Sequence, residues 1–250
     1  MRRAVVTGGS RGIGLAIARR LARDGMTVHV TYAHDDAAAA AAVGAARAEG
    51  LALEAARCDV NDPEAWRALF SRGTPLGDDG ATVLVHAAGF TRDRLLMTMP
   101  PADFDAVLGV HLRGGFLAAQ AVMKGMIGAR WGRMIFITSP TATLGRRGQC
   151  NYGAAKAGLV GLMRSLVHEV SRFSITVNCV CAGLVDTALT DELPAAVRAE
   201  LLAGIPLGRP GTADEIAALC GFLCSERAGY ITNQSLAVDG GLDLVQADAF

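Results

Sequence analysis

The sequence lacks the features that mark several specialised classes of protein. Its 24 basic and 24 acidic residues balance, so no overall charge indicates binding to nucleic acid or to a membrane surface. No run of about 20 apolar residues predicts a membrane span, and the first residues hold no apolar stretch long enough for a signal peptide. The six cysteines have no zinc-ligand spacing. We therefore expect a cytoplasmic protein with reduced cysteines and no bound metal.

The chain is also poor in aromatic residues and in linker-like segments. Aromatic residues make up 5% of the chain and hydrophobic residues 51%, so alanine, valine, leucine and isoleucine must build most of the core. No segment rich in proline or serine divides the 250 residues. Because this length suits one large domain, we expect a single domain over residues 1–250.

Short apolar runs alternate with helical patterns along most of the chain. Strands are predicted at residues 4–7, 27–32, 52–57, 82–86, 133–138, 175–180 and 235–238. Helices are predicted at residues 14–24, 35–49, 63–72, 101–129, 152–173 and 212–224. This alternation predicts βαβ units, and hence an α/β Rossmann fold with a doubly wound, parallel, seven-stranded sheet and helices on both faces.

A glycine-rich segment, TGGSRGIG at residues 7–14, directly follows the first predicted strand and leads into the first helix. Small residues here permit a tight turn and let the backbone approach a pyrophosphate, while the helix amino terminus offers it N–H groups. A plain tight turn is the alternative, but the strand–turn–helix context favours a dinucleotide. The candidate cofactor contacts in this turn are Gly8, Ser10, Arg11, Gly12, Ile13 and Gly14.

The end of the second strand determines which dinucleotide is selected. An acidic residue there would bind the 2′-hydroxyl of NAD, whereas a cation would favour the 2′-phosphate of NADP. Tyr32 occupies the position expected for that acid, and Asp35 lies later, where it can cap the next helix. Arg11 and His34 are candidate phosphate contacts, and Asp59 after the third strand suits the adenine amino group. We therefore expect NADP(H).

A tyrosine and a lysine stand four residues apart in NYGAAKAG, at residues 151–158. On a helix, Tyr152 and Lys156 share one face. Together with TGGSRGIG, this motif makes nearly the whole chain resemble the short-chain dehydrogenase/reductase family. The most similar branch is that of the 3-oxoacyl-(acyl-carrier-protein) reductases and polyketide ketoreductases. The segments that carry this similarity are GFTRDRLLMTM (89–99), GRRGQCNYGAAKAGLVG (145–161), SITVNCVCAG (174–183) and YITNQSLAVDGG (230–241).

The resemblance implies a reaction and a role for each motif residue. It implies reduction of a 3-oxoacyl thioester, carried by a carrier protein or by CoA, in fatty-acid or polyketide-type biosynthesis. Tyr152 would protonate the forming alkoxide, Lys156 would bind the nicotinamide ribose and pass on a proton, and Ser139 would donate to the carbonyl oxygen. The lysine and a nicotinamide cation would lower the pKa of the tyrosine. Further implied cofactor contacts are Val60, Ala88, Gly89, Val185 and Thr187.

Three departures from the family's pattern border this site. His111, in VLGVHLRGG, stands where the family has an asparagine at a helix kink. Either its imidazole replaces that asparagine in a proton relay, or the change is tolerated while backbone and water carry the relay. Ala87 in HAAG replaces an asparagine, and Ala182 in CAGLVDT replaces a proline. These changes favour a diverged branch of the family.

The resemblance also implies partners. Arg130 and Arg172 match or lie next to positions that bind an acidic carrier protein, and residues 184–209 would form a substrate lid. Arg146 and Arg147 either contact a pantetheine phosphate or a carrier, or lie in a solvated loop. We expect a homotetramer or a heteromer with a related reductase subunit. The alternatives are another short-chain alcohol or sugar dehydrogenase, and a catalytically weakened partner subunit that binds nucleotide.

Overall fold

Seven parallel strands form one sheet in the order β3-β2-β1-β4-β5-β6-β7 in the computed structural model. This arrangement confirms the α/β fold predicted from the alternation of strands and helices. The structure describes residues 2–74, 76–77, 80–187, 190 and 195–242. The strands are β1 Arg3–Thr7, β2 Thr27–Tyr32, β3 Leu53–Arg57, β4 Val83–His86, β5 Gly132–Thr138, β6 Ile175–Ala182 and β7 Ser235–Val238.

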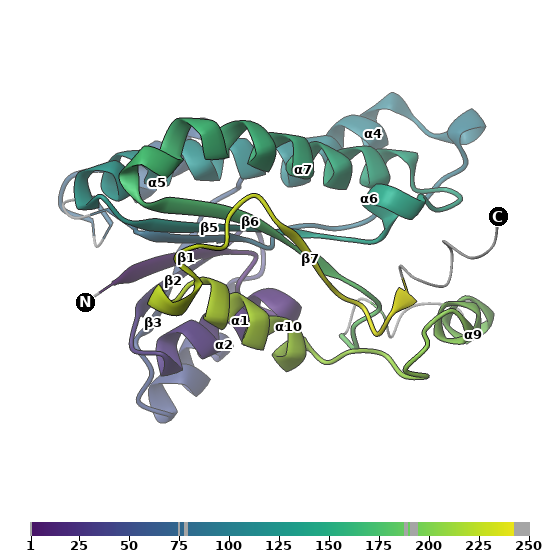
Figure 1. The fold of residues 1–250 in the computed structure, drawn as a ribbon, viewed down its shortest axis with the longest axis horizontal. Helices are drawn as coiled ribbons and strands as arrows, with labels where there is room; N and C mark the ends of the chain where they lie inside the picture. Colours follow the sequence, from purple (N-terminus) through teal and green to yellow (C-terminus); the bar gives the residue numbers. More distant parts are fainter. Residues whose placement is uncertain (1, 75, 78–79, 188–189, 191–194, 243–250) are drawn as a thin grey trace.

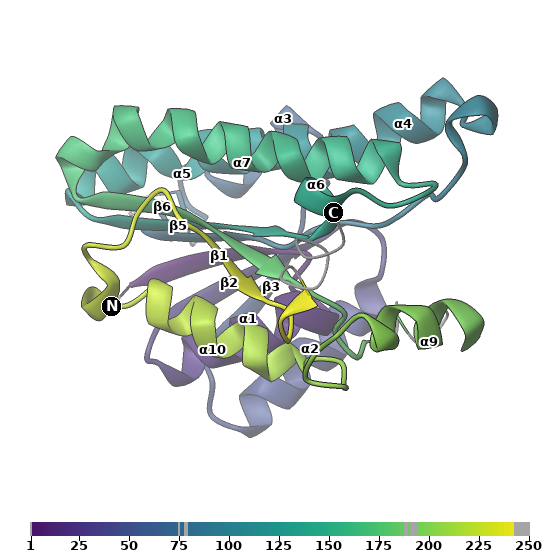
Figure 2. The same cartoon turned by 45° about the vertical axis from the view of Figure 1, so that its right-hand side comes forward.

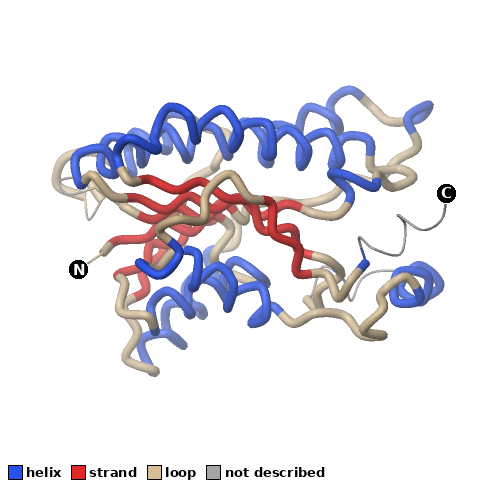
Figure 3. Tube along the Cα trace, in the orientation of Figure 1, coloured by secondary structure: helices blue, strands red, loops and turns tan. Residues whose placement is uncertain are grey.

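Helices cover both faces of the sheet, as Figures 1, 2 and 3 show. The α-helices are α1 Gly12–Arg23, α2 Asp36–Ala48, α3 Pro63–Leu69, α4 Pro101–Leu108, α5 Gly114–Ala129, α6 Thr141–Leu144, α7 Cys150–Val170, α9 Ala195–Ala203 and α10 Ala213–Leu223. The 3-10 turns are η1 Leu96–Thr98, η3 Ser171–Phe173 and η4 Glu226–Ala228, and η2 Gly109–Arg113 is π-helical.

Each strand is apolar on both sides because its alternate residues enter two separate cores. Ala4 and Val6 of β1 join the core beneath α1, α2 and α10. Val5, between them, joins the core beneath α3, α5 and α7. All three residues are fully buried. This double burial explains why the strands read in the sequence as continuous apolar runs rather than as alternating ones.

The long helix predicted at residues 101–129 is interrupted in its middle. α4 and α5 are joined by the π-helical turn Gly109–Arg113, with His111 at its centre. The whole stretch Pro101–Ala129 is long and apolar enough to cross a membrane, but half of its most apolar part is buried inside the protein. A helix of a protein core has the same length and composition, so this helix packs as part of the second core.

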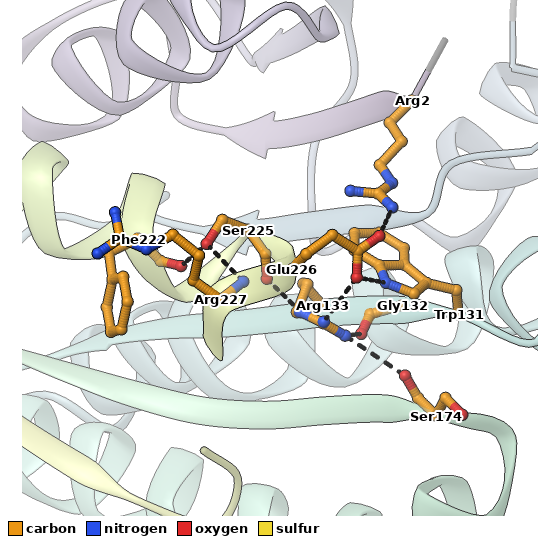
Figure 4. A network of polar contacts seen from close by, with 9 residues as sticks. All are labelled: Arg2, Trp131, Gly132, Arg133, Ser174, Phe222, Ser225, Glu226 and Arg227. Atoms are coloured by element: carbon orange, nitrogen blue, oxygen red, sulfur yellow. Dashed lines mark hydrogen bonds and ion pairs between the residues drawn. The ribbon is translucent and has the colours of Figure 1, made fainter. Parts of the chain in front are cut away.

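A polar network around Arg133 covers the amino-terminal ends of the strands (Figure 4). The Arg133 side chain is buried, and its guanidinium donates to the carbonyl oxygens of Ser225 at 3.2 Å and Gly132 at 2.8 Å. Glu226 accepts hydrogen bonds from Arg2 and from the indole of Trp131. These contacts attach η4 to the starts of β1 and β5. They lie at the opposite end of the sheet from the carboxyl ends of the strands.

Candidate active site

A cleft of about 570 Å³ lies where the carboxyl ends of β1 and β4 meet. The connections from these two strands leave in opposite directions, and such a switch point is where parallel α/β sheets bind ligands. The volume suits a small-molecule or cofactor site. The predicted cofactor contacts that line the cleft are Gly8, Ser10, Arg11, Gly12, Ile13, Gly14, His34, Asp59, Val60, Ala88, Gly89 and Thr187.

The glycine turn brings the β1 and β4 loops into backbone contact. A Cβ atom on Gly8 would lie 2.7 Å from Cα of Ala88, and Gly8 has a φ of +63°. A Cβ on Gly14 would lie 2.3 Å from the carbonyl oxygen of Gly8. Any larger residue would therefore fill the turn or push the helix away from it. The open cradle, with the amino end of α1 beside it, fits the pyrophosphate of a dinucleotide.

The carboxylates of Asp35 and Asp36, just after β2, contact other groups of the protein. Asp35 caps α2 by accepting from the N–H of Ala38 at 2.9 Å, as predicted, and lies 3.7 Å from the guanidinium of Arg11. A hydrogen bond to the Asp36 carboxylate raises the pKa of Tyr32. Arg11, His34 and Asp35 all line this end of the cleft.

Thr7 braces the loop after β4, a role that sequence reasoning did not assign. Its Oγ1 accepts from the N–H groups of Ala87 and Ala88, both at 3.1 Å, and contacts Nδ1 of His86 at 2.9 Å. Burial lowers the pKa of His86 to about 3, so its imidazole is neutral. Thr7 therefore donates to Nδ1, and Nε2–H donates to the carbonyl oxygen of His111 at 2.9 Å. Alanine at position 87 is tolerated because its neighbours provide the brace.

His111 lies between the cleft and helix α7. Its side chain is 2% exposed, and its Nε2 lies 2.8 Å from the carbonyl oxygen of Phe90. Its ring packs edge-on against the ring of Tyr152, with centroids 5.1 Å apart. Burial lowers its pKa well below the usual range, so the imidazole is neutral. Its Nε2 also lies 3.2 Å from the N–H of Phe90, and its other ring nitrogen is Nδ1. That Nδ1 has no hydrogen-bond partner among the described residues. The predicted proton relay through this side chain stays a prediction.

Tyr152 and Lys156 share one face of α7, as their spacing predicts. The buried Lys156 ammonium donates to the carbonyl oxygen of Ile137 at 2.7 Å and lies 5.4 Å from the centroid of the tyrosine ring. Burial lowers the pKa of Lys156 to about 8 and raises that of Tyr152 to about 12. Among the protein's own groups, the loss of solvation outweighs the hydrogen bond with Ser139. The predicted lowering of the tyrosine pKa, which includes a bound nicotinamide cation, stays a prediction.

Ser139 follows β5 and lies beside Tyr152. A hydrogen bond between the Ser139 hydroxyl and the tyrosine oxygen partly offsets the rise in the pKa of Tyr152. The serine oxygen also contacts the N–H and the hydroxyl of Thr141, each at 3.3 Å. The structure therefore brings the three predicted catalytic side chains together at the carboxyl ends of β5 and β6. They are not part of the cleft lining, but Gly89 and Phe90 on that lining contact His111, which touches Tyr152.

Two buried amides next to the tyrosine were missed by sequence reasoning. Gln149 and Asn151 are both buried, and the Asn151 side chain donates to the carbonyl oxygen of Arg92 at 3.0 Å. Gln149 donates to the carboxylate of Asp93 at 2.8 Å. The signal available in the sequence was the placement of two amides in QCNY, directly before Tyr152.

The remaining predicted contacts lie elsewhere. Val185 is buried in the core beneath α1 and α10 and is not among the residues that line the cleft. Its carbonyl oxygen accepts from Thr190 at 2.7 Å, and its contact with the cofactor stays a prediction. Arg130 ends α5 and Arg172 lies in η3, both at the amino edge of the sheet and opposite the cleft. Carrier binding by these arginines stays a prediction. Of the predicted lid, 188–189 and 191–194 lie outside the described residues, and 195–203 form α9.

Comparisons with known proteins cover almost the entire chain. The family described as Enoyl-(Acyl carrier protein) reductase matches residues 8–243. The 3-oxoacyl-(acyl-carrier-protein) reductase FabG of Pseudomonas aeruginosa is 42% identical over 244 residues, with 96% of each chain covered. FabG of Escherichia coli is 41% identical over 245 residues, with 97% of each chain covered. The reductase MabA of Mycobacterium tuberculosis is 39% identical over 243 residues, covering 97% of this chain and 93% of MabA.

These matches agree with the fold, the glycine turn and the Tyr152–Lys156 pair. The chain therefore belongs to the short-chain dehydrogenase/reductase family, whose members bind a nicotinamide cofactor.

Proposed function

We propose that this protein reduces a 3-oxoacyl thioester to the 3-hydroxyacyl thioester with NADPH, in fatty-acid or polyketide-type biosynthesis. One observation carries the proposal: the hydroxyl groups of Ser139 and Tyr152 are hydrogen-bonded, with the buried amine of Lys156 one turn further along α7. Two hydroxyl donors converging on one point suit the oxygen of a ketone. The names of the relatives, which are 3-oxoacyl-(acyl-carrier-protein) reductases, support this substrate class.

The bound cofactor would supply a hydride to the carbonyl carbon. Ser139 donates a hydrogen bond to the carbonyl oxygen, where negative charge develops, and Tyr152 gives that oxygen its proton. With a pKa of about 12, Tyr152 is protonated at neutral pH and is ready to act as the acid. Lys156, with a pKa of about 8, is still largely an ammonium there and can return a proton to the tyrosine oxygen. General acid catalysis of this kind contributes about 10²–10⁴-fold.

Selectivity for NADP(H) is part of the proposal. Arg11 and His34 line the cleft beside the end of β2, and Tyr32 stands where an NAD-selecting acid would be expected. Asp35 caps α2 and pairs with Arg11, which supports a structural use for this carboxylate. A 2′-phosphate would compete with Asp35 for the same guanidinium.

Two roles are open for His111, and one substitution distinguishes between them. In the first, its buried Nδ1 binds a water that links Lys156 to solvent, and the lack of a partner for this atom among the described residues supports it. In the second, the ring only supports Tyr152 and Phe90. Turnover of His111→Asn that keeps the wild-type pH profile would remove the relay and leave the packing role.

Partners and surroundings complete the proposal. We infer a cytoplasmic homotetramer, or a heteromer with a related reductase subunit, acting on a carrier-bound or CoA-bound substrate. Large apolar side chains exposed near α4 and α5 support an interface there. They are Leu96, Met97 and Phe116, which are 77%, 92% and 46% exposed. Light scattering of the purified protein checks this, since a monomer would contradict it.

The position of Arg130 and Arg172, at the amino-terminal ends of the strands, limits how a carrier protein could be bound. β5 has seven residues, and at about 3.3 Å per residue it separates Arg130 from Ser139 by roughly 23 Å. A carrier held by Arg130 and Arg172 would therefore serve the site of a neighbouring subunit more easily than that of the same chain. Residues 184–209 would cover the acyl group as a lid.

Initial-rate measurement with NADPH and a short 3-oxoacyl thioester tests the proposed function. Wild-type protein should oxidise NADPH in proportion to thioester, and Tyr152→Phe should lose that turnover while still binding NADPH. Oxidation of simple alcohols or sugars with NADP⁺, or reduction of the corresponding ketones with NADPH, in place of thioester turnover would favour another dehydrogenase of the family. Tight NADPH binding without turnover of any ketone would instead indicate a catalytically weakened partner subunit.

A further inference from the structure

A chain of hydrogen bonds leads from Ser139 to a carboxylate at the protein surface. The serine and Thr141 hydroxyls lie 3.3 Å apart, and the Thr141 hydroxyl lies 3.3 Å from Oε1 of Gln149. The amide nitrogen of Gln149 donates to Oδ2 of Asp93 at 2.8 Å. Gln149 is 6% exposed, whereas Asp93 is at the surface.

The carboxylate determines the direction of the whole chain. An ionised carboxylate only accepts, so the NH₂ group of Gln149 faces Asp93 and its oxygen faces Thr141. The hydroxyl proton of Thr141 is then used to donate to Gln149. Because that proton points away from Ser139, the Thr141 oxygen accepts from the serine hydroxyl, and the Thr141 N–H donates to the serine oxygen. These two contacts hold the serine oxygen beside Tyr152.

The segment that carries Asp93 is held in place without help from its side chain. The N–H of Arg94 donates to the carbonyl oxygen of Gly148 at 2.8 Å. Asn151 donates to the carbonyl oxygen of Arg92 at 3.0 Å. Two flanking contacts therefore attach residues 92–94 to the start of α7. Removing the Asp93 carboxylate should release Gln149 while leaving the loop where it is.

The backbone of the serine is restrained, because its carbonyl oxygen accepts from the N–H of Ala142 at 2.9 Å and α6 begins two residues later. This backbone contact does not set the rotamer of the side chain. A serine side chain has three staggered positions of similar energy. Only one of them can aim the hydroxyl at the position where the ketone oxygen would meet Tyr152.

We propose that Asp93, Gln149 and Thr141 are positioning residues that hold the hydroxyl of Ser139 in its productive orientation. This inference rests on the proposed function, in which Ser139 donates to the substrate carbonyl. The three residues need not touch the substrate, so their loss should lower kcat and leave NADPH binding unchanged.

The first test removes only the hydroxyl link. Thr141→Val keeps the side-chain shape but breaks the chain, whereas Thr141→Ser keeps the hydroxyl. We expect kcat to fall about tenfold in the valine variant, the effect of losing one oriented hydrogen bond, and to recover in the serine variant. Thr143→Val is the matched control, because Thr143 lies in the same short helix and its hydroxyl donates to the carbonyl oxygen of Pro140. An equal loss in Thr143→Val would overturn the inference.

The second test asks whether the chain acts through the serine. Gln149→Ala should lower kcat about tenfold in the wild-type background and cause no further loss in a Ser139→Ala background. An equal fold-loss in both backgrounds would refute the chain while leaving the proposed function intact. If Ser139→Ala alone keeps full turnover, the proposed role of the serine is wrong, and so is the positioning role of Asp93, Gln149 and Thr141. The ratios can be measured on whichever ketone the wild-type protein reduces.

Discussion

Replacing Gly89 with alanine should destabilise the protein because of one neighbour, His111. A Cβ built on Gly89 would lie 2.1 Å from Cε1, 2.8 Å from Nδ1 and 2.9 Å from Nε2 of the imidazole. These three atoms are its nearest neighbours, and the backbone of Gly89 is not in the left-handed region. An alanine would therefore fit the backbone, and the first atoms that its Cβ meets would all belong to the ring.

The magnitude follows from how firmly the ring is held. The imidazole is 2% exposed, bonds the carbonyl oxygen of Phe90 and packs against Tyr152, so it cannot move aside without losing these contacts. Overpacking of this kind costs about 1–3 kcal/mol. We expect Gly89→Ala to lower the free energy of unfolding by about 2 kcal/mol, which for a chain of this size lowers Tm by about 4–8 °C.

Urea unfolding of four proteins tests this reasoning. Wild type, Gly89→Ala, His111→Ala and the double variant form a double-mutant cycle, in which His111→Ala removes the ring. In the His111→Ala background, Gly89→Ala should cost less than about 0.5 kcal/mol. A loss of the same size in both backgrounds would refute the clash. Gly44→Ala is the control: it lies inside α2, and a Cβ atom added there would have no neighbour within 4 Å, so it should stabilise by about 0.5–1 kcal/mol.

Three further predictions concern charge, selectivity and capping. Because burial lowers the pKa of Lys156 from 10.5 to about 8, the unfolded chain binds more protons between these pH values. The unfolding free energy of wild type minus Lys156→Met should therefore rise there by up to about 3 kcal/mol, and a flat difference would contradict this. Arg11→Ala should raise KM for NADPH about tenfold and leave KM for NADH unchanged; equal effects would argue against phosphate binding. Thr212→Ala, which breaks the capping box with Glu215, should cost about 1 kcal/mol in urea unfolding, and Thr212→Ser should cost little.

Local patterns were sufficient to predict the strands and the glycine turn. β2 and β7 begin and end at the predicted residues, and the others differ by at most two residues at either end. Burial on both faces makes such strands distinct in the sequence. Asp35 was also predicted correctly as a cap, because capping depends on the three residues that follow it.

Features that depend on distant contacts could not be predicted in the same way. Within the π-helical turn, the carbonyl oxygen of His111 accepts a hydrogen bond from His86, which lies 25 positions earlier in the chain. The bond between Gln149 and Asp93 joins residues 56 positions apart. Helical periodicity carries no information on such pairs. The raised pKa of Tyr152 was missed for a related reason, since it depends on how deeply the folded chain buries the phenol.

Transfer of deuterium from the cofactor to the product tests the central claim most directly. The protein would be incubated with a 3-oxoacyl thioester and NADPH that carries deuterium on the transferred position of its nicotinamide ring. Mass spectrometry should find one deuterium at C3 of the 3-hydroxyacyl thioester with wild-type protein and essentially none with Tyr152→Phe. Unlabelled hydroxyacyl product, or equal labelling in both proteins, would contradict hydride transfer assisted by Tyr152.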